Sequence, residues 1–240
     1  MAGKFVTLLD EYFYRDFSGN WDDQMLRERI LRSITKDDVL LDLGAGAGIV
    51  KQMNFKDLAA KVCGIDLDTR VKDNPYLDEA HVSDAREIPY ADSTFDVVFA
   101  DNVMEHLDAP SDVLSEIYRV LKPGGILLFK TPNKFHYMPI ISRLTPLGFH
   151  RWFNRLRRRK EIDTFPTRYL LNSEVETNVL GANAGFEIKR VELIEGRPEY
   201  LRFSVLTYLI GICYERLVNS TRALRNFRIL LIAELQKPSN

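Results

Sequence analysis

Short apolar runs without polar alternation recur in the chain, and helical or turn-rich segments separate them. The runs cover residues 39–43, 61–66, 95–100 and 125–131, with a weaker one at 81–84. A strand that is apolar on both faces belongs in a parallel sheet that helices cover on both sides. The sequence therefore predicts an α/β fold built on a doubly wound, mostly parallel sheet.

Two further strands and several helices are expected around this region. Residues 186–194 nearly alternate between polar and apolar side chains, and residues 227–235 form a last apolar run. They complete a predicted seven-stranded sheet whose last strand is antiparallel, and Ser173 is expected to cap a helix at 172–184. The whole chain is predicted to be one domain, 1–240, with a helical cap at 1–36 (broken near 18–20) and two substrate-side helical insertions forming a lid, 133–172 and 195–225.

Three glycines at alternate positions follow the first apolar run: Gly44, Gly46 and Gly48, with Asp42 ahead of them. A triphosphate-binding loop would need lysine after the last glycine, and a dinucleotide-binding loop would need a glycine at Ile49. Neither condition is met. The pattern instead favours a tight turn under an amino-acid moiety and a ribose. A short helix expected at residues 49–53 would offer its N–H groups to a carboxylate. An ordinary strand-to-helix turn is the structural alternative.

Acidic side chains stand at the ends of the next three runs. Asp66 closes the second run and is placed to accept the hydroxyls of a ribose. Asp84 and Ala85 close the third, where a carboxylate and a backbone N–H suit the edge of an adenine ring. Asp101 and Asn102 close the fourth. Each acid has a structural alternative as a helix cap or turn residue, but parallel strands bring their carboxyl ends to one edge of the sheet.

Four segments carry a resemblance to a known family. They are residues 41–48 (LDLGAGAG), 64–68 (GIDLD), 82–110 and 116–133 (EIYRVLKPGGILLFKTPN). In this order and spacing they resemble the class I S-adenosylmethionine-dependent methyltransferases. The resemblance implies a Rossmann-like seven-stranded sheet with a reversed last strand, and S-adenosylmethionine as the cofactor.

The resemblance also assigns roles to particular positions. Asp42 and the first two glycines of the loop would line the methionine portion, and Asp66 would bind the ribose. Asp84 with Ala85 would meet the adenine, and Asp101 with its neighbour would form the wall near the sulfonium. The full predicted set of cofactor-binding residues is Asp42, Gly44, Ala45, Gly46, Asp66, Leu67, Asp84, Ala85, Asp101 and Asn102.

The methyl group of such a cofactor is already electrophilic, so the protein mainly has to position a nucleophile and exclude water. An oxygen nucleophile also needs a base, and His106 is the predicted one because it follows the fourth strand. The alternative is that Glu105 and His106 only fix their loop. His136 and His150, in the first insertion, remain open as bases. No metal site is predicted.

The composition limits the partners that the chain can have. The net charge is −1, so nucleic acid is an unlikely ligand, and no run of 18 uncharged apolar residues predicts a membrane span. The N-terminus lacks a secretory pattern, and Cys63 and Cys213 are interpreted as reduced core residues of a cytoplasmic protein. The basic run Arg151–Lys160 leaves three alternatives open: a solvated helix, contact with anionic lipid or phosphate, or nucleic acid.

The prediction for function is methyl transfer to an oxygen of a small-molecule acceptor that is partly apolar or glycosylated. The apolar stretch 201–218 is interpreted either as a core helix or as a cover for such an acceptor. Two alternatives remain: an RNA methyltransferase, and a non-catalytic regulatory protein that binds the cofactor. The four residues from Asp101 to Met104 lack the motif of enzymes that methylate amino groups of bases, which weakens the first alternative.

Overall fold

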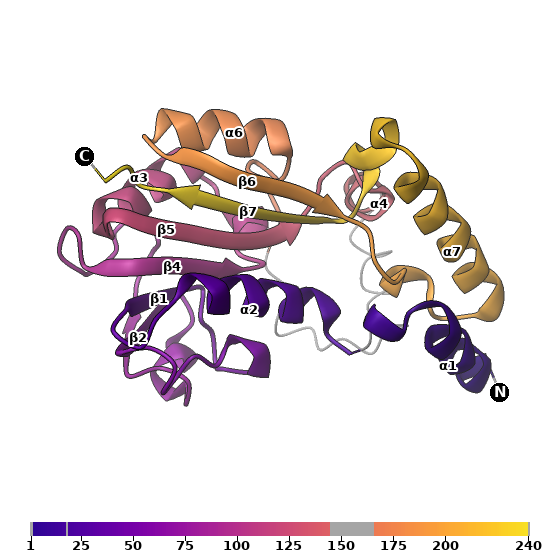
Figure 1. Ribbon diagram of the computed structural model, residues 1–240, viewed down its shortest axis with the longest axis horizontal. Coiled ribbons are helices and arrows are strands. Elements are labelled where there is room, and N and C mark those ends of the chain that lie inside the picture. The colour runs from indigo at the N-terminus through magenta and orange to yellow at the C-terminus, as the bar shows by residue number, and fades with distance from the viewer. Residues whose placement is uncertain (1, 18, 145–165, 240) are drawn as a thin grey trace. The chain divides into compact units, whose positions relative to one another are not determined.

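The computed structural model describes residues 2–17, 19–144 and 166–239 (Figure 1). The chain divides into two compact units. The sheet unit consists of Asp22–Thr131, Thr167–Glu192 and Leu231–Asn240, and the helical unit consists of Met1–Trp21, Pro132–Pro166 and Leu193–Leu230. The single domain 1–240 stays a prediction, and each unit is described by itself.

Seven strands form one sheet in the order β3-β2-β1-β4-β5-β7-β6. Strands β1 to β5 pair in parallel, while the start of β5 and the end of β7 exchange hydrogen bonds between Gly124, Gly125 and Lys237 in antiparallel fashion. The predicted fold class is thus confirmed. The strands are β1 Val39–Leu43, β2 Lys61–Asp66, β3 Glu79–Val82, β4 Phe95–Asp101, β5 Leu121–Pro132, β6 Glu187–Ile194 and β7 Leu230–Gln236.

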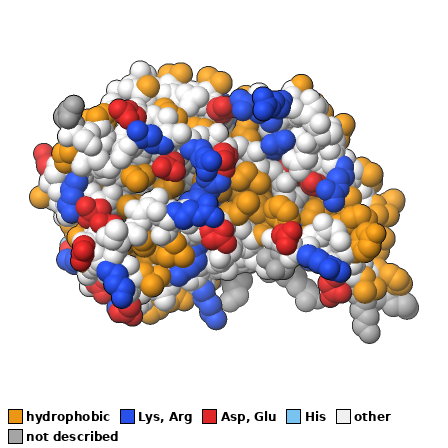
Figure 2. Space-filling model, in the orientation of Figure 1, with side chains coloured by type: hydrophobic (Ala, Val, Ile, Leu, Met, Phe, Trp, Pro, Cys, Tyr) orange, Lys and Arg blue, Asp and Glu red, His pale blue; other side chains and the backbone are white. Residues whose placement is uncertain are grey.

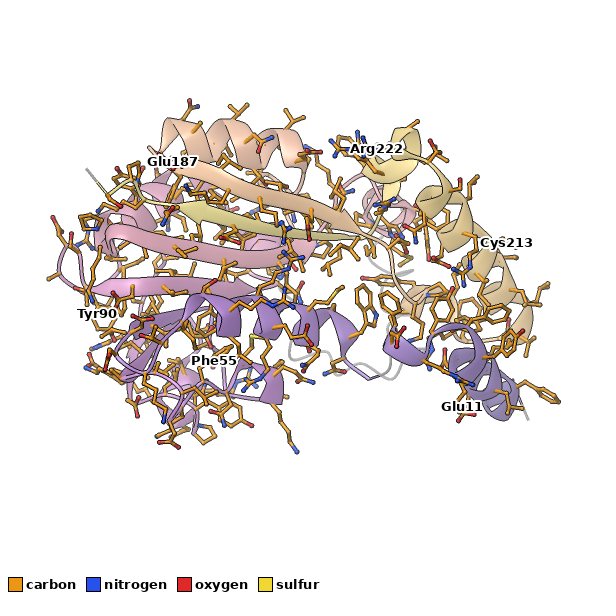
Figure 3. The ribbon with its side chains drawn as sticks, in the orientation of Figure 1. Glu11, Phe55, Tyr90, Glu187, Cys213 and Arg222 are labelled. Carbon is orange, nitrogen blue, oxygen red and sulfur yellow. The ribbon has the colours of Figure 1, made fainter. Side chains whose placement is uncertain are left out.

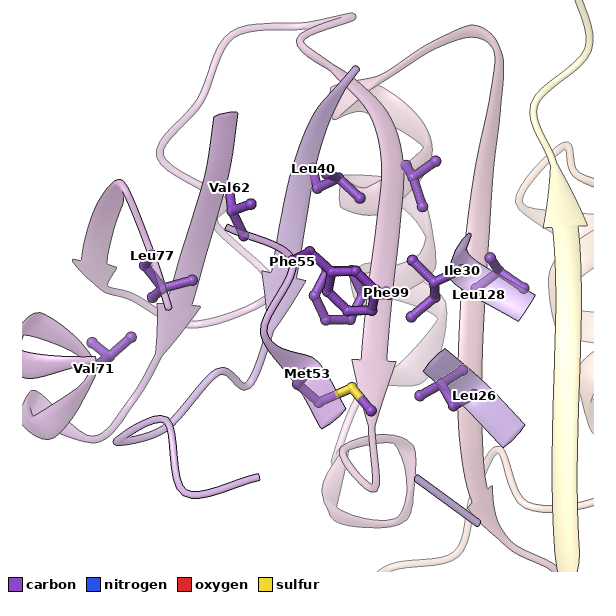
Figure 4. Close-up of a cluster of buried hydrophobic side chains, with 11 residues drawn as sticks. Leu26, Ile30, Leu40, Met53, Phe55, Val62, Val71, Leu77, Phe99 and Leu128 are labelled. Atoms are coloured by element: carbon purple, nitrogen blue, oxygen red, sulfur yellow. The ribbon is translucent and has the colours of Figure 1, made fainter. Parts of the chain in front are cut away.

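A helix packs on the sheet through an apolar stripe. In α2 (Trp21–Ser33), Leu26 and Ile30 are fully buried and join a core cluster with Leu40 of β1 and Phe99 of β4 (Figure 4). Phe55 stacks edge-on against Phe99 in the same cluster. This core holds β1 and β4, the two central strands whose carboxyl ends carry the predicted site.

Two more helices complete the sheet unit, α3 (Pro110–Val120) and α6 (Glu174–Asn183). Ser173 caps α6 by accepting a hydrogen bond from the backbone N–H of Glu176, which confirms the predicted N-cap. A Cβ atom at Gly181 of α6 would press on Leu235 of β7 and Ile188 of β6, at 2.7 and 2.8 Å. The glycine therefore lets α6 lie close to the last two strands.

The helix expected after the glycine loop is reduced to one 3-10 turn, Lys51–Met53. Only 12 residues join Gly48 to β2, and Phe55 among them is buried in the core. A connection this short has no room for an α-helix that returns along the sheet. The prediction of helical N–H groups for a carboxylate is therefore wrong, because no α-helix begins at residue 49.

The helical unit contains α1 (Ala2–Phe13), α4 (Tyr137–Leu144) and α7 (Val205–Ser220). Tyr14 and Tyr208 lie in its core, and the Tyr14 hydroxyl donates to Glu215 Oε2 at 3.0 Å. The basic run Arg151–Lys160 lies outside the described residues, as does His150. The lid role of the two insertions stays a prediction.

The two cysteines differ in burial. Cys63 is buried in β2 as predicted, but Cys213 is exposed on α7, so its interpretation as a core residue is wrong. The cause is the helical period: Cys213 lies on the side of α7 opposite Tyr208 and Ile212, which face the core. None of the helices in the described ranges has the length and apolar character needed to cross a membrane.

Candidate cofactor and catalytic site

The glycine loop is held at the carboxyl end of β1 by hydrogen bonds to β2. The backbone N–H groups of Gly44 and Ala45 donate to the carbonyl of Ile65 at 2.8 and 3.2 Å. Gly44 has a φ of +75°, and a Cβ atom there would overlap the Val103 side chain. Only glycine satisfies both conditions without strain. Gly44 is nevertheless exposed, and residues 45–48 are half-buried, so part of the loop backbone stays accessible.

Asp66 joins β2 to the same loop. Its Oδ2 accepts the backbone N–H of Gly46 at 2.9 Å, and its Oδ1 accepts that of Asp68 at 2.8 Å. Each carboxylate oxygen keeps a further lone pair for a ligand hydroxyl. Leu67 follows with 68% of its surface exposed, which leaves an apolar side chain beside the carboxylate.

Asn74 holds the glycine loop in place through its side-chain amide. Sequence reasoning missed this residue. Its side-chain Nδ2 donates to the carbonyl oxygens of Ala45 and Gly46 at 3.0 and 3.2 Å, while its Oδ1 accepts the N–H of Tyr76 at 2.9 Å. A Cβ atom at Gly48 would overlap the Asn74 amide. The pair Asn74-Pro75 was the available signal, since it marks a fixed turn.

Replacing Asn74 with alanine is expected to lower the free energy of unfolding by about 2 kcal/mol, because it removes hydrogen bonds from a buried amide and leaves loop carbonyls unpaired. The affinity for demethylated cofactor should fall roughly tenfold, since the loop loses its brace. Urea denaturation and calorimetry measure the two effects. Asn183→Ala, at an exposed position of α6, is the control and should leave both values unchanged. Equal behaviour of the two variants would contradict the bracing role.

Two carboxyl groups at the ends of β1 and β4 have little exposure: Asp42 is buried, and the Asp101 side chain is 12% exposed. Burial raises the pKa of Asp42 well above its ordinary value, and the nearby charges of Asp101 and Asp66 raise it further. Burial also raises the pKa of Asp101 to about 7, although the ammonium group of Lys130 pulls it down. Groups with such pKa values mark a site that favours a positive charge beside them.

Lys130 is the second residue that sequence reasoning missed. It is fully buried in β5, and its Nζ lies 2.6 Å from Asp22 Oδ2 and 3.1 Å from Asp101 Oδ1, with a further ion pair to Asp23. Burial alone would lower the pKa of Lys130, but these three carboxylates outweigh it and raise the pKa. The signal in the sequence was a lone lysine in an apolar strand, at 125–131.

Asp84 lies two residues beyond β3, later than the predicted strand end. Arg86 Nη2 donates to its Oδ2 at 2.7 Å, and this interaction holds the pKa of Asp84 below its ordinary value. The carboxylate is thus occupied by a neighbour on its own turn, and Ala85 between them is half-buried. Contact of this pair with an adenine ring stays a prediction.

Asn102 turns the chain sharply after β4. Its φ is +55°, its backbone N–H donates to the carbonyl of Lys130 at 3.1 Å, and its side-chain Nδ2 donates to Asp101 Oδ1 at 2.9 Å. The turn directs the following residues along the carboxyl edge of the sheet.

His106 ends the short 3-10 helix Met104–His106 that follows this turn. Its imidazole is 30% exposed, and its Nε2 lies 4.0 Å from Glu105 Oε1. Among the residues that the structure describes, no group of three or more His, Cys, Asp or Glu side chains is arranged to hold a metal ion.

A hydrogen-bond network fixes Glu105. The Thr131 hydroxyl donates to Glu105 Oε2 at 2.8 Å and accepts from Asn172 Nδ2 at 2.6 Å. Burial raises the pKa of Glu105, while His106 acts against this rise. The backbone carbonyl of Glu105 also accepts the N–H of Arg168 at 2.7 Å. The arrangement fits both the loop-fixing role and a histidine that is oriented by a carboxylate.

The other candidates from the helical unit have partners of their own. His136 is buried, its Nδ1 accepts the N–H of Met138 at 3.2 Å, and its ring stacks against Tyr137 and Tyr214. Arg15 of the same unit likewise has a partner, because its Nε donates to the carbonyl of Glu11 at 3.0 Å.

Comparison with known proteins gives one domain match and many relatives. A family model described as a methyltransferase domain matches residues 41–129. A protein of Mycolicibacterium smegmatis named as a probable S-adenosylmethionine-dependent methyltransferase is 34% identical over 133 residues, which are 53% of this chain and 50% of that protein. The ubiquinone biosynthesis O-methyltransferase of Nitrosococcus oceani is 30% identical over 52% of this chain and 60% of that protein.

A solved structure gives a likeness in fold. The geranyl diphosphate C-methyltransferase of Streptomyces coelicolor, in complex with S-adenosyl-L-homocysteine, superposes with a TM-score of 0.55 at 15% identity and covers 89% of this chain and 76% of that one. The chain spans about half the length of the curated relatives that it matches.

Proposed function

We propose that this chain, which carries a class I S-adenosylmethionine-dependent methyltransferase domain over residues 41–129, transfers the methyl group of that cofactor to an oxygen of a small-molecule acceptor. One observation carries the proposal. A glycine loop that admits no side chain at Gly44 is tied by Asp66 to the carboxyl edge of a parallel sheet. Ligands bind at this edge in open α/β sheets.

The residues of the sheet unit fit the cofactor. Asp66 would accept the ribose hydroxyls through the lone pairs that its backbone contacts leave, and the exposed Leu67 would pack against the adenine ring. Gly44 and Gly46 would let the methionine portion approach the loop backbone. Asp84 and Ala85 would meet the adenine edge if the carboxylate is shared with Arg86.

The charge behind the loop also supports this cofactor, which carries a methyl group on a cationic sulfur. Asp42 and Asp101 are carboxyl groups whose pKa values burial has raised, so a positive charge nearby would stabilise their ionised forms. Lys130 forms an ion pair with Asp101, with Nζ 3.1 Å from Oδ1, and helps to hold its carboxylate in place.

The chain's own contribution to the reaction would be a base and a fixed loop. The His106 imidazole would take the proton from the acceptor hydroxyl while the oxygen attacks in line with the S–CH₃ bond. Glu105, held by Thr131, would stabilise the imidazolium that results.

The acceptor class follows from the chemistry and from relatives. One relative is named as a ubiquinone biosynthesis O-methyltransferase, and its name supports an apolar acceptor methylated on oxygen. We propose a partly apolar metabolite of this kind, and the cytoplasm as the compartment of the protein.

Asp66→Asn tests the cofactor part of the proposal. It keeps the shape of the side chain but removes its charge, so the affinity for demethylated cofactor should fall about 30-fold in calorimetry. Asp73→Asn, an exposed acid nearby, is the matched control and should bind like the parent chain. No binding by the parent chain, or equal binding by Asp66→Asn, would remove the assignment.

A transfer assay separates the remaining alternatives. The full chain is incubated with methyl-labelled cofactor and a panel of quinol, phenol, glycolipid and RNA acceptors. Label on a small-molecule oxygen supports the proposal. Label on RNA would favour an RNA methyltransferase, and tight binding without transfer to any acceptor would favour a regulatory cofactor-binding protein.

A further inference from the structure

We propose that α1 and α7 of the helical unit form a docking surface for a bilayer that contains anionic phospholipid. Six large apolar side chains on these two helices are between 56% and 77% exposed. They are Phe5, Leu8 and Tyr12 on α1, and Leu206, Ile210 and Leu217 on α7. In Figure 2 hydrophobic side chains gather over the region where Figure 1 places these helices. This proposal does not rest on the proposed reaction.

The exposed stripe on α7 is not the side that packs in the protein. Tyr208, Ile212 and Val218 are buried, and the first two join Val6 and Tyr14 in the core cluster of the unit. The exposed apolar residues of α7 stand on the opposite side at helical spacing. A helix that has apolar side chains on its outward side as well as on its buried side offers a surface for a second apolar partner.

The α1 residues follow the same rule. Phe5, Leu8 and Tyr12 are spaced at three and four residues and share one face, while Val6 lies in the core. Both helices belong to the same unit and pack on each other through that core. An amphipathic pair of this kind suits burial in the headgroup region rather than a span.

The charges beside the stripe select an anionic surface. Between residues 205 and 227 the sequence has one acid, Glu215, and it is buried and bonded to Tyr14. The arginines of this segment, at positions 216, 222 and 225, are all exposed. Figure 3 places Arg222 at one end of α7 and Cys213 along its outer side. The exposed formal charges of this segment are therefore all positive.

The same charges disfavour a second copy of the chain. A two-fold contact of α7 with α7 would bring the apolar stripes together, but it would also gather the arginines of both copies at one interface. Residues 205–227 offer no exposed acid to pair with them, and the exposed acid on α1, Glu11, would not lie in a contact of α7 with α7. A bilayer supplies both the apolar layer and the negative headgroups.

Vesicle co-sedimentation of the full chain tests the proposal. Phosphatidylcholine vesicles and mixed phosphatidylcholine–phosphatidylglycerol vesicles are compared. The double variant Leu206→Gln with Ile210→Gln should lower the partition coefficient on mixed vesicles about 30-fold, since two apolar side chains that would enter the bilayer are lost. The matched control Val175→Gln with Val179→Gln, at exposed apolar positions of α6, should bind like the parent chain.

A second pair of substitutions tests the charge. Arg222→Gln with Arg225→Gln should lower binding to the mixed vesicles roughly 20-fold and leave binding to neutral vesicles unchanged. The proposal is overturned if the parent chain binds neither vesicle, or if the α7 variant binds as well as the α6 control. Light scattering that shows a dimer dissociated by the α7 substitutions would assign the surface to a second copy instead.

Discussion

Lys130→Met is expected to lower the free energy of unfolding by about 3–5 kcal/mol, because it leaves three carboxylates around a buried site without their cation. The lysine is fully buried in β5 and contacts Asp22, Asp23 and Asp101. Methionine fills a similar volume, so the loss measures charge rather than packing. Urea unfolding measures the effect. Lys189→Met, which removes an exposed pair with Glu187, is the control and should cost less than about 1 kcal/mol.

The destabilisation should depend on pH in a defined direction. Burial already raises the pKa of Asp101 to about 7 while Lys130 is present. Because the charge of Lys130 lowers this pKa, replacing the lysine should raise the pKa further. Between the ordinary carboxyl pKa and this raised value, the folded variant binds a proton that the unfolded chain does not. Its stability therefore falls as the pH rises, and the variant should lose more at about pH 8.5 than at about pH 5.5. A loss that is small or constant with pH would contradict the charge cluster.

His106→Ala is expected to lower kcat by a factor of about 10²–10⁴, the usual contribution of a positioned base, while the affinity for demethylated cofactor stays unchanged. We expect kcat to fall without a change in cofactor affinity because the proposed cofactor contacts lie on the glycine loop and the strand ends. Transfer of labelled methyl and calorimetry on the same preparation measure the two quantities.

His81→Ala is the matched control for this variant. His81 lies in β3, where its Nε2 contacts Glu79 Oε1 at 2.8 Å and its ring packs against Tyr90. Its loss should leave kcat unchanged. If His106→Ala turns over at the parent rate with intact cofactor binding, the histidine serves only to fix the loop.

Much of the fold could be predicted from the sequence because turn and loop residues clearly separate its apolar runs. The runs at 39–43 and 61–66 match β1 and β2 in full, since loops and glycines bound them closely. The resemblance to class I methyltransferases, with S-adenosylmethionine as the cofactor, is confirmed by the methyltransferase-domain match and by a relative named as a probable S-adenosylmethionine-dependent methyltransferase. The short helix expected at residues 49–53 is a 3-10 turn instead, in a connection to β2 that also places Phe55 in the core.

The site was predictable where local sequence sets the geometry and not where strand register does. Asp66 and Gly46 were found from spacing, and the structure joins them by a hydrogen bond. Lys130 was missed because only the parallel register of β4 and β5 sets it beside Asp101. Asn74 was missed because its partners lie 28 and 29 residues earlier in the chain.

The near-neutral pKa of Asp101 links the proposed cofactor cycle to proton exchange. A sulfonium held beside this carboxyl would favour its ionised form, so capture of the cofactor near pH 7 would expel a proton. Methyl transfer turns the sulfonium into an uncharged thioether, and the carboxyl would then regain its proton. In each turnover the positive charge lost from the sulfur would thus be replaced by a proton that binds Asp101. This would ease the exchange of spent for fresh cofactor.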